Sequence, residues 1–219
     1  MKTINKKSNT VSSRKYENYL LNNKTQKGEE YNYTRIGSKD YNIFGGCYYI
    51  NNYTEFLDIY YQHVFENKND EYLTEKQLLN DGPLLVDIDL RYSKETFTRL
   101  HTKEHIIDLI HLYAIKLTEI YNIIDKTNIN VYVLEKSNIN KLEKITKDGI
   151  HLIFTISMDK SAQSLLRKKI IENIGNMWDN LPITNSYEDM IDEGVCKGFV
   201  NWQMYGSKKP GNETYKLSY

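Results

Sequence analysis

Residues 81–92 read Asp-Gly-Pro-Leu-Leu-Val-Asp-Ile-Asp-Leu-Arg-Tyr, and their alternation predicts a β-strand with two distinct faces. The apolar face would carry Leu84, Val86, Ile88 and Leu90, and the opposite face Leu85, Asp87, Asp89 and Arg91. Acidic residues are depleted in strands, and two carboxylates on one face repel each other, so a compensating cation is expected. Arg91 or a divalent metal ion could compensate them, although a lone Asp-x-Asp is more often a solvated surface feature.

The composition sets broad limits on the class of protein. A chain of 219 residues can form one large domain or two small modules, and its 29 Lys and Arg balance its 29 Asp and Glu. The two cysteines, Cys47 and Cys196, form no zinc motif. The chain has neither an apolar run of membrane-spanning length nor a secretory signal. We therefore expect a soluble protein in a reducing, intracellular compartment.

Hydrophobic periodicity predicts strands alternating with helices. Strands are expected over 31–34, 47–50, 81–92, 131–134, 149–156 and 201–205. Helices are expected over 53–67, 74–79, 102–124 and 162–178. This order predicts an α+β fold.

The first 28 residues carry seven Lys and Arg against the single acid Glu17, which predicts a flexible basic arm over 1–28 and a folded domain over 29–219. Near the third helix, His101, His105 and His111 have no paired metal-binding spacing. We expect these histidines to be exposed or to act as caps.

Residues elsewhere in the chain could complete a site with the two strand acids. Asp192, after the apolar pair Met190-Ile191, is a candidate third carboxylate for a two-metal site. Cations and donors suited to a triphosphate are Lys147, His151, Ser207 and Lys209, and Arg35 could also reach a phosphate. Each of these residues also has an ordinary explanation at a surface, in a turn or within a strand.

The order of these motifs resembles that of the archaeo-eukaryotic primase superfamily. The three motifs are Asp87-Ile88-Asp89, then Lys147-x-Gly149-x-His151, then an apolar residue before Asp192. The resemblance is strongest to the primase portion of poxvirus-type primase-helicases and to primase-polymerases. Further similar stretches extend it over about residues 33–211: 34–37, 45–50, 72–78 and 202–210.

The resemblance implies roles for individual residues. Asp87, Asp89 and Asp192 would hold two Mg²⁺ or Mn²⁺ ions, and His151 would contact the triphosphate of an incoming NTP or dNTP. Further phosphate-binding positions would be Lys147, Asn201 and Lys209. Two departures weaken the phosphate site: Gly149 replaces a frequent serine, and Gln203 stands where some relatives have arginine.

The resemblance also implies an architecture and partners. A mixed α/β N-terminal module and a sheet-and-helix module resembling an RNA-recognition motif would bind substrates in the cleft between them. The expected activity is template-dependent primer synthesis on single-stranded DNA during viral replication, in the host cytoplasm or a viral replication compartment. A C-terminal helicase domain would follow in the full-length protein, and no membrane partner is expected.

Two alternatives remain open at this point. A metal-dependent glycosyltransferase also uses Asp-x-Asp to hold a divalent ion and a nucleotide diphosphate. A non-catalytic module that holds single-stranded DNA for a helicase would bind template without metal. Sugar-nucleotide turnover and labelled-nucleotide extension assays would distinguish these possibilities.

Overall fold

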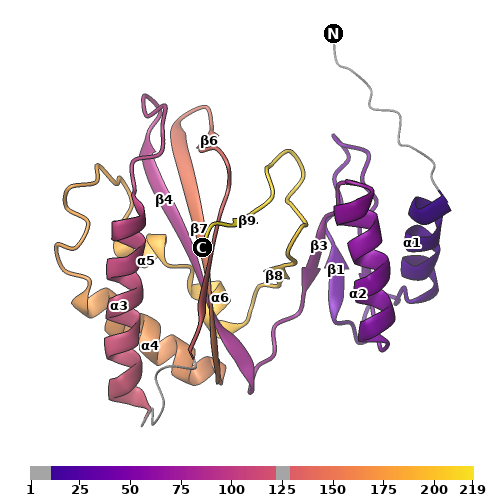
Figure 1. Cartoon of the computed structure of the whole chain (residues 1–219), viewed down its shortest axis with the longest axis horizontal. Coiled ribbons are helices and arrows are strands. Elements are labelled where there is room, and N and C mark those ends of the chain that lie inside the picture. The colour runs from indigo at the N-terminus through magenta and orange to yellow at the C-terminus, as the bar shows by residue number, and fades with distance from the viewer. Residues whose placement is uncertain (1–10, 122–128) are drawn as a thin grey trace. The chain divides into compact units, whose positions relative to one another are not determined.

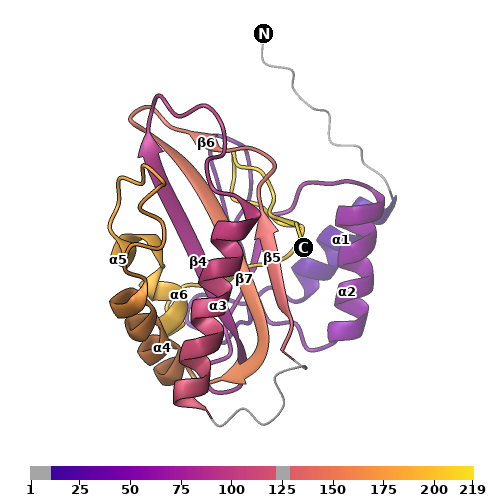
Figure 2. The same cartoon turned by 60° about the vertical axis from the view of Figure 1, so that its left-hand side comes forward.

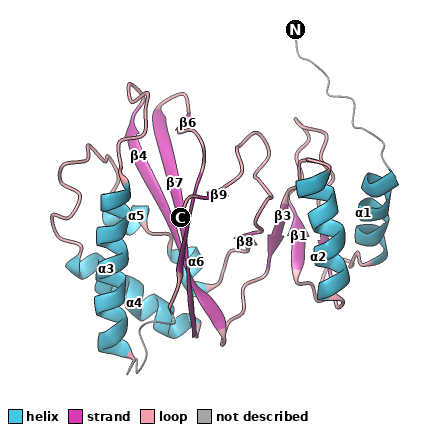
Figure 3. Cartoon of the chain, viewed as in Figure 1, coloured by secondary structure: helices cyan, strands magenta, loops and turns pink. Residues whose placement is uncertain are grey.

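The computed structural model describes residues 11–121 and 129–219, which fall into two compact units. Among these residues, unit 1 comprises 11–76 and Gln203–Thr214, and unit 2 comprises 77–121, 129–202 and Tyr215–Tyr219. Both units combine helices with strands (Figure 3). The expected α+β fold class is therefore confirmed.

Unit 1 is a small sheet covered by helices (Figure 1). Its elements are α1 (Val11–Asn22), β1 (Tyr33–Arg35), β2 (Gly46–Tyr48), α2 (Tyr53–Tyr61), the π-helical turn η1 (Gln62–Glu66) and β3 (Leu73–Glu75). The sheet order is β2-β1-β3-β8, where β8 (Trp202–Gln203) contributes Gln203 to this unit. Phe56 and Tyr60 of α2 pack in its core with Tyr33 and Leu73 of the sheet.

The flexible arm predicted over 1–28 is wrong for residues 11–22, which form α1. Tyr16 and Leu20 lie one helical turn apart and are fully buried in the core of unit 1. The buried face of α1 is narrow, and the surrounding Asn, Ser and Lys residues give this segment the composition of a polar tail. Residues 1–10 of the predicted arm lie outside the described residues.

The short helix predicted over 74–79 is also wrong. Leu73–Glu75 is β3, and its Thr74 pairs with Thr34 of β1, where the two hydroxyl oxygens lie 2.6 Å apart. Long-range strand pairing overrides the weak local preference for a helix here, as it commonly does for short segments.

Unit 2 is built on long antiparallel strands (Figure 2). Its elements are β4 (Gly82–Ser93), α3 (Lys103–Ile120), β5 (Val131–Glu135), β6 (Asn140–Lys141), β7 (Ile145–Met158), α4 (Lys160–Asn173), α5 (Tyr187–Met190), α6 (Glu193–Lys197) and β9 (Lys216–Leu217). The sheet order is β4-β7-β5-β9, with β6 paired to β7. Helices α3 and α4 lie on one face of this sheet (Figures 1 and 2).

The alternation predicted for residues 81–92 is confirmed in β4. Leu84, Val86, Ile88 and Leu90 are buried in the main core of unit 2, against α3 and α4. Asp87 and Asp89 therefore project from the opposite face, where both are partly exposed. The same alternation in β7 buries Ile150, Leu152 and Phe154 beneath the helices.

His101 departs from the prediction that it is exposed or a cap. Its ring is buried, with Nε2 2.8 Å from a Glu135 carboxylate oxygen and Nδ1 3.3 Å from Asp148. Arg99 also binds both oxygens of Asp148, at 2.8 and 2.9 Å. A buried carboxylate needs such partners, and the partners of Asp148 lie far from it in the sequence. His105 does act as a cap, in a reciprocal pair with Thr102 at the start of α3.

The two cysteines should differ in reactivity. Iodoacetamide at mildly alkaline pH is expected to alkylate the partly exposed Cys47 and to leave Cys196 unmodified in the folded protein. Cys196 is 2% exposed in α6, and burial raises the pKa of its thiol to about 11, so little thiolate forms. Peptide mass mapping in native buffer and in urea checks this. Equal labelling of both thiols in native buffer would contradict the packing of α6.

Within the described residues, no helix combines the length and apolar character needed to cross a membrane.

Candidate active site

The register of β4 and β7 assembles one polar face in unit 2. Asp87 lies opposite His151, Asp89 opposite Gly149, and Arg91 opposite Lys147. Directly opposed residues of antiparallel strands point to the same face, so two acids, an imidazole and two cations share it. This surface is called the acid face below. It contains five residues singled out in the sequence, and β4 and β7 alone are enough to bring them together.

Charges on the acid face are paired. Lys147 Nζ lies 2.7 Å and Arg91 Nε 3.1 Å from the same Asp89 carboxylate oxygen. These side chains are about one third exposed, so the pairs orient Asp89 more than they stabilise the fold. His151 Nε2 lies 3.5 Å from an Asp87 carboxylate oxygen. Two neighbouring acids are thus tolerated because cations from the same two strands offset their repulsion.

Asp192 reaches the edge of β4 through its backbone. Its N–H donates to the Asp87 carbonyl at 3.0 Å, and Ile191 forms a bridge with Ile88. The exposed Asp192 side chain caps α6, since its carboxylate accepts from the Val195 N–H at 2.8 Å. The third predicted acid therefore follows a residue that is paired with the acid-bearing strand.

The segment before Asp192 is also fastened to β4. Asn185 receives a hydrogen bond from the Arg91 N–H at 2.9 Å and donates to the Asp89 carbonyl at 2.9 Å. These two hydrogen bonds of the Asn185 side chain attach the segment before Asp192 to the backbone of β4.

His151 is held between two aromatic rings. The ring of Tyr215 stacks on its imidazole, with centroids 3.6 Å apart and planes inclined by 19°. The Trp202 ring lies 4.4 Å away on a 40° incline and packs with Leu85 and Val195. Burial, followed by the nearby carboxylates of Asp87 and Asp89, raises the pKa of Tyr215 well above its ordinary value. The imidazole orientation is therefore set by packing as well as by Asp87.

The importance of Tyr215 was missed by sequence reasoning. It is one of 19 tyrosines and lies outside every motif. A glycine within a strand often marks the close approach of another group, so Gly149 was an available signal. Gly149 indicates that something approaches, and only the structure identifies Tyr215 as the approaching residue.

The oxygen donors of the acid face suit a hard divalent cation. Among residues 11–121 and 129–219, no three acidic, imidazole or thiol side chains are gathered closely enough to hold a metal ion. Magnesium commonly binds through one or two protein carboxylates and completes its shell with water and substrate phosphates. Asp87 and Asp89 fit that smaller requirement, and Asp192 could add a ligand only by reorienting its capping carboxylate.

The remaining candidates lie in other settings. Asn201 is partly buried between α6 and β8 in unit 2, whereas Arg35, Ser207 and Lys209 belong to unit 1. Ser207 is buried; its hydroxyl accepts from the Leu73 N–H at 3.1 Å and lies 3.0 Å from that of Tyr60. Lys209 is exposed.

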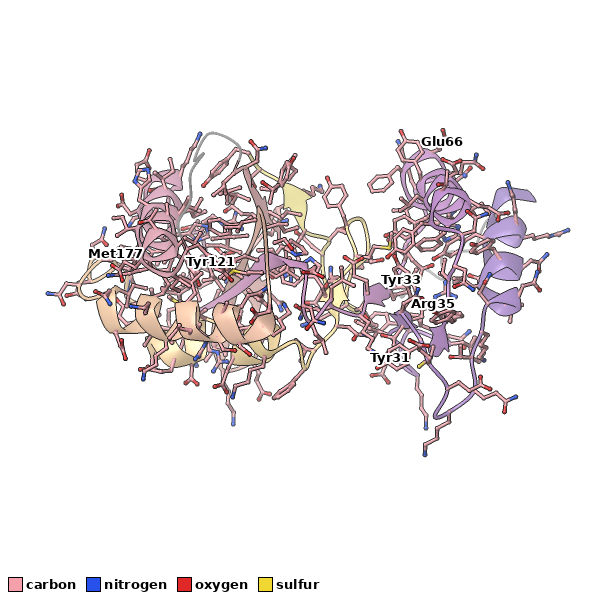
Figure 4. All side chains as sticks on the ribbon, turned by 90° about the horizontal axis from the view of Figure 1, so that it is seen from below. Tyr31, Tyr33, Arg35, Glu66, Tyr121 and Met177 are labelled. Atoms are coloured by element: carbon pink, nitrogen blue, oxygen red, sulfur yellow. The ribbon has the colours of Figure 1, made fainter. Side chains whose placement is uncertain are left out.

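Arg35, labelled in Figure 4, is paired with acids of its own unit. Its guanidinium donates two hydrogen bonds to Glu71, at 2.8 and 2.9 Å, and two to Glu17, both at 2.9 Å. Four of the five N–H donors of an arginine are thereby used, which leaves little of it for a phosphate.

Gln203, the second departure from the resemblance, donates to the Ser207 carbonyl at 2.6 Å. It therefore has a turn-stabilising contact within unit 1.

Comparison with known proteins supports the resemblance to archaeo-eukaryotic primases. The family model described as "C962R protein N-terminal AEP domain" matches residues 39–219. A protein of Acanthamoeba polyphaga mimivirus named "Putative helicase L207/L206" is 28% identical over 134 residues, which are 60% of this chain. The aligned region is only 14% of that mimivirus protein. Because the family model matches well over half of the sequence, the chain belongs to the C962R N-terminal AEP domains, a family of the archaeo-eukaryotic primase type.

Proposed function

We propose that this chain is the nucleotidyl-transfer domain of a viral primase-helicase and makes primers on single-stranded DNA. The observation that carries the proposal is the acid face, where Asp87 and Asp89 stand beside Lys147 and His151 in a chain of the primase-type family. The helicase name of the mimivirus relative supports a linked or partner helicase. The finer likeness to poxvirus-type proteins and primase-polymerases is part of this proposal.

In the proposed reaction, a 3′-hydroxyl oxygen attacks the α-phosphorus of a nucleoside triphosphate. The new P–O bond forms as the bond between the α-phosphorus and the bridging oxygen to the β-phosphorus breaks. Pyrophosphate leaves, and the hydroxyl proton passes to solvent. Such transfer depends mainly on positioning and charge neutralisation, so no side chain is required as a dedicated general base.

Asp87 and Asp89, with Asp192 as a third ligand, would hold Mg²⁺ or Mn²⁺. Bound ions would lower the pKa of the attacking hydroxyl and neutralise charge on the leaving pyrophosphate. Lys147 and His151 would contact the triphosphate, since Lys147 supplies a positive charge and His151 a ring nitrogen on the same face. A further phosphate contact is proposed for Asn201, which belongs to the same unit as the acid face.

A primer-synthesis assay tests the proposal. The protein is incubated with single-stranded DNA, labelled NTPs or dNTPs, and Mg²⁺ or Mn²⁺. We expect template-dependent dinucleotides and short primers, loss of product with EDTA, and recovery on adding excess metal. Absence of synthesis with every template, nucleotide and metal would contradict the proposal. Metal-independent template binding would then favour a DNA-holding module, and sugar-nucleotide turnover would favour a glycosyltransferase.

A further inference from the structure

Tyr215 joins the acid face from the last segment of the chain. Strand β9 begins at the next residue and pairs with β5, where Leu217 lies opposite Leu134. Leu134 is in turn the cross-strand partner of His151. This pairing brings the Tyr215 ring into its stacked position on the His151 imidazole. The C-terminal strand therefore supplies an aromatic residue to the acid face.

The Tyr215 hydroxyl occupies the space directly above Gly149. A Cβ at position 149 would collide with the hydroxyl oxygen and would approach the ring carbon Cζ to 3.2 Å. Any other residue at position 149 must therefore displace Tyr215 or strain the strand. Gly149 lies opposite Asp89, so the hydroxyl stands where a side chain of the acid face would otherwise begin.

The Tyr215 hydroxyl is a hydrogen-bonding group on the acid face. Tyrosine offers one donor and also accepts, and it keeps its proton near neutral pH. An anionic ligand on the acid face would find Lys147 and His151 on the two sides of position 149. The backbone of Gly149 provides no side-chain donor, whereas Tyr215 provides one at the same position.

We propose that Tyr215 takes the place of a side chain at position 149, orienting His151 with its ring and donating its hydroxyl to a phosphate oxygen of the bound nucleoside triphosphate. The hydrogen bond to phosphate rests on the proposed function, whereas the orientation of His151 by the Tyr215 ring does not. Tyr215 is a positioning residue with respect to His151, and a binding residue with respect to the triphosphate.

Four variants separate the ring from the hydroxyl. Tyr215→Phe removes only the hydroxyl, and Tyr215→Ala removes both groups. Gly149→Ser places a new side chain against Tyr215, and the double variant Gly149→Ser/Tyr215→Phe clears the hydroxyl and leaves the serine. Tyr219→Phe is the matched control, because this tyrosine has a buried hydroxyl with no hydrogen-bond partner among the described residues. Thermal melts confirm that each variant folds.

The first measurement is the NMR shift of the His151 ring protons in the absence of nucleotide, assigned with His151→Gln. Stacked rings shift these protons upfield. We expect the upfield shift to persist in Tyr215→Phe and Tyr219→Phe and to decrease in Tyr215→Ala, where only the contribution of the Trp202 ring remains. An unchanged shift in Tyr215→Ala would overturn the orienting role, whether or not the chain makes primers.

The second measurement is the Kd of a nonhydrolysable nucleoside triphosphate in the presence of Mg²⁺. Tyr215→Phe should weaken binding about tenfold or more, as expected for a lost hydrogen bond to a charged group. Gly149→Ser should also weaken it, and the double variant should bind more tightly than Gly149→Ser alone, because its hydroxyl then has room. Tyr219→Phe should bind like the wild type.

Wild-type affinity in Tyr215→Phe, or a double variant that binds no better than Gly149→Ser, would overturn the phosphate contact. If wild-type protein makes primers in either case, only this inference fails. If wild-type protein neither binds triphosphate nor makes primers, the proposed function fails together with the phosphate contact. The His151 shift then still decides the orienting role.

Discussion

Asp89→Asn and Asp87→Asn are each expected to reduce primer synthesis by about a thousandfold or more while leaving the protein folded. Asparagine keeps the size of the side chain and removes the negative charge that a divalent ion requires. Stabilisation of developing charge by bound metal is worth several kcal/mol, and about 4 kcal/mol corresponds to a thousandfold in rate. Extension of single-stranded templates under saturating Mg²⁺ or Mn²⁺ measures the effect.

The folded state should tolerate these substitutions, because both acids are partly exposed and repel each other. In Asp89→Asn, Lys147 and Arg91 lose a partner at a site that water can reach, so the melting temperature should change little. Asp81→Asn is the matched control, since Asp81 is exposed and immediately precedes the same strand. Full synthesis by both acid-face variants would remove the basis of the proposed function.

Arg35→Met is expected to lower the free energy of unfolding by about 3–5 kcal/mol, the usual cost of removing one partner from a buried ion pair. Glu71 is fully buried and receives two hydrogen bonds from Arg35. Without the guanidinium, the charge of Glu71 would remain in the core of unit 1. Urea unfolding followed by intrinsic fluorescence measures the loss.

The loss should depend on pH. Burial already raises the pKa of Glu71, and removing the nearby Arg35 charge raises it further. A carboxyl with a raised folded-state pKa takes up protons on folding, so its cost is small below the unfolded-state pKa and grows as pH rises through the folded-state pKa. The destabilisation of Arg35→Met relative to wild type should therefore be larger at neutral than at acidic pH.

Two comparisons make the Arg35 experiment decisive. Lys39→Met removes an exposed cation a few residues away and should leave stability unchanged. Arg35→Met/Glu71→Leu removes both buried charges and should recover much of the loss. If Arg35→Met keeps wild-type stability and instead weakens triphosphate binding, Arg35 contacts a phosphate, as the sequence predicted.

Much of the acid face was predictable from local sequence. Alternation in residues 81–92 assigns Asp87 and Asp89 to the face opposite the core, and the same rule places His151 opposite the buried Ile150 and Leu152. Period-two patterning is local, because each side chain needs only its own strand to determine its face. The order of the three motifs then indicated the primase-type family to which the chain belongs.

Errors arose where long-range contacts outweighed local preference. Residues 11–22 have the composition of a polar tail, but in the folded chain Tyr16 and Leu20 are buried in the core of unit 1. Thr74 lies in β3 because Thr34 of β1 pairs with it. His101 is buried because the carboxylates of Asp148 and Glu135 bind its ring nitrogens. None of these partners is marked in the sequence around the residue concerned.

The sequence by itself determined which strand carries the acids, which face they occupy and in what order the motifs follow. Only the tertiary structure decided that Asp89 faces Lys147, that the Ile191 backbone joins the edge of β4, and that Tyr215 fills the space above Gly149. The physical reason is the range of the interactions. Alternation acts between neighbours in sequence, whereas strand register, ring stacking and close approach join residues that meet only after the chain has folded.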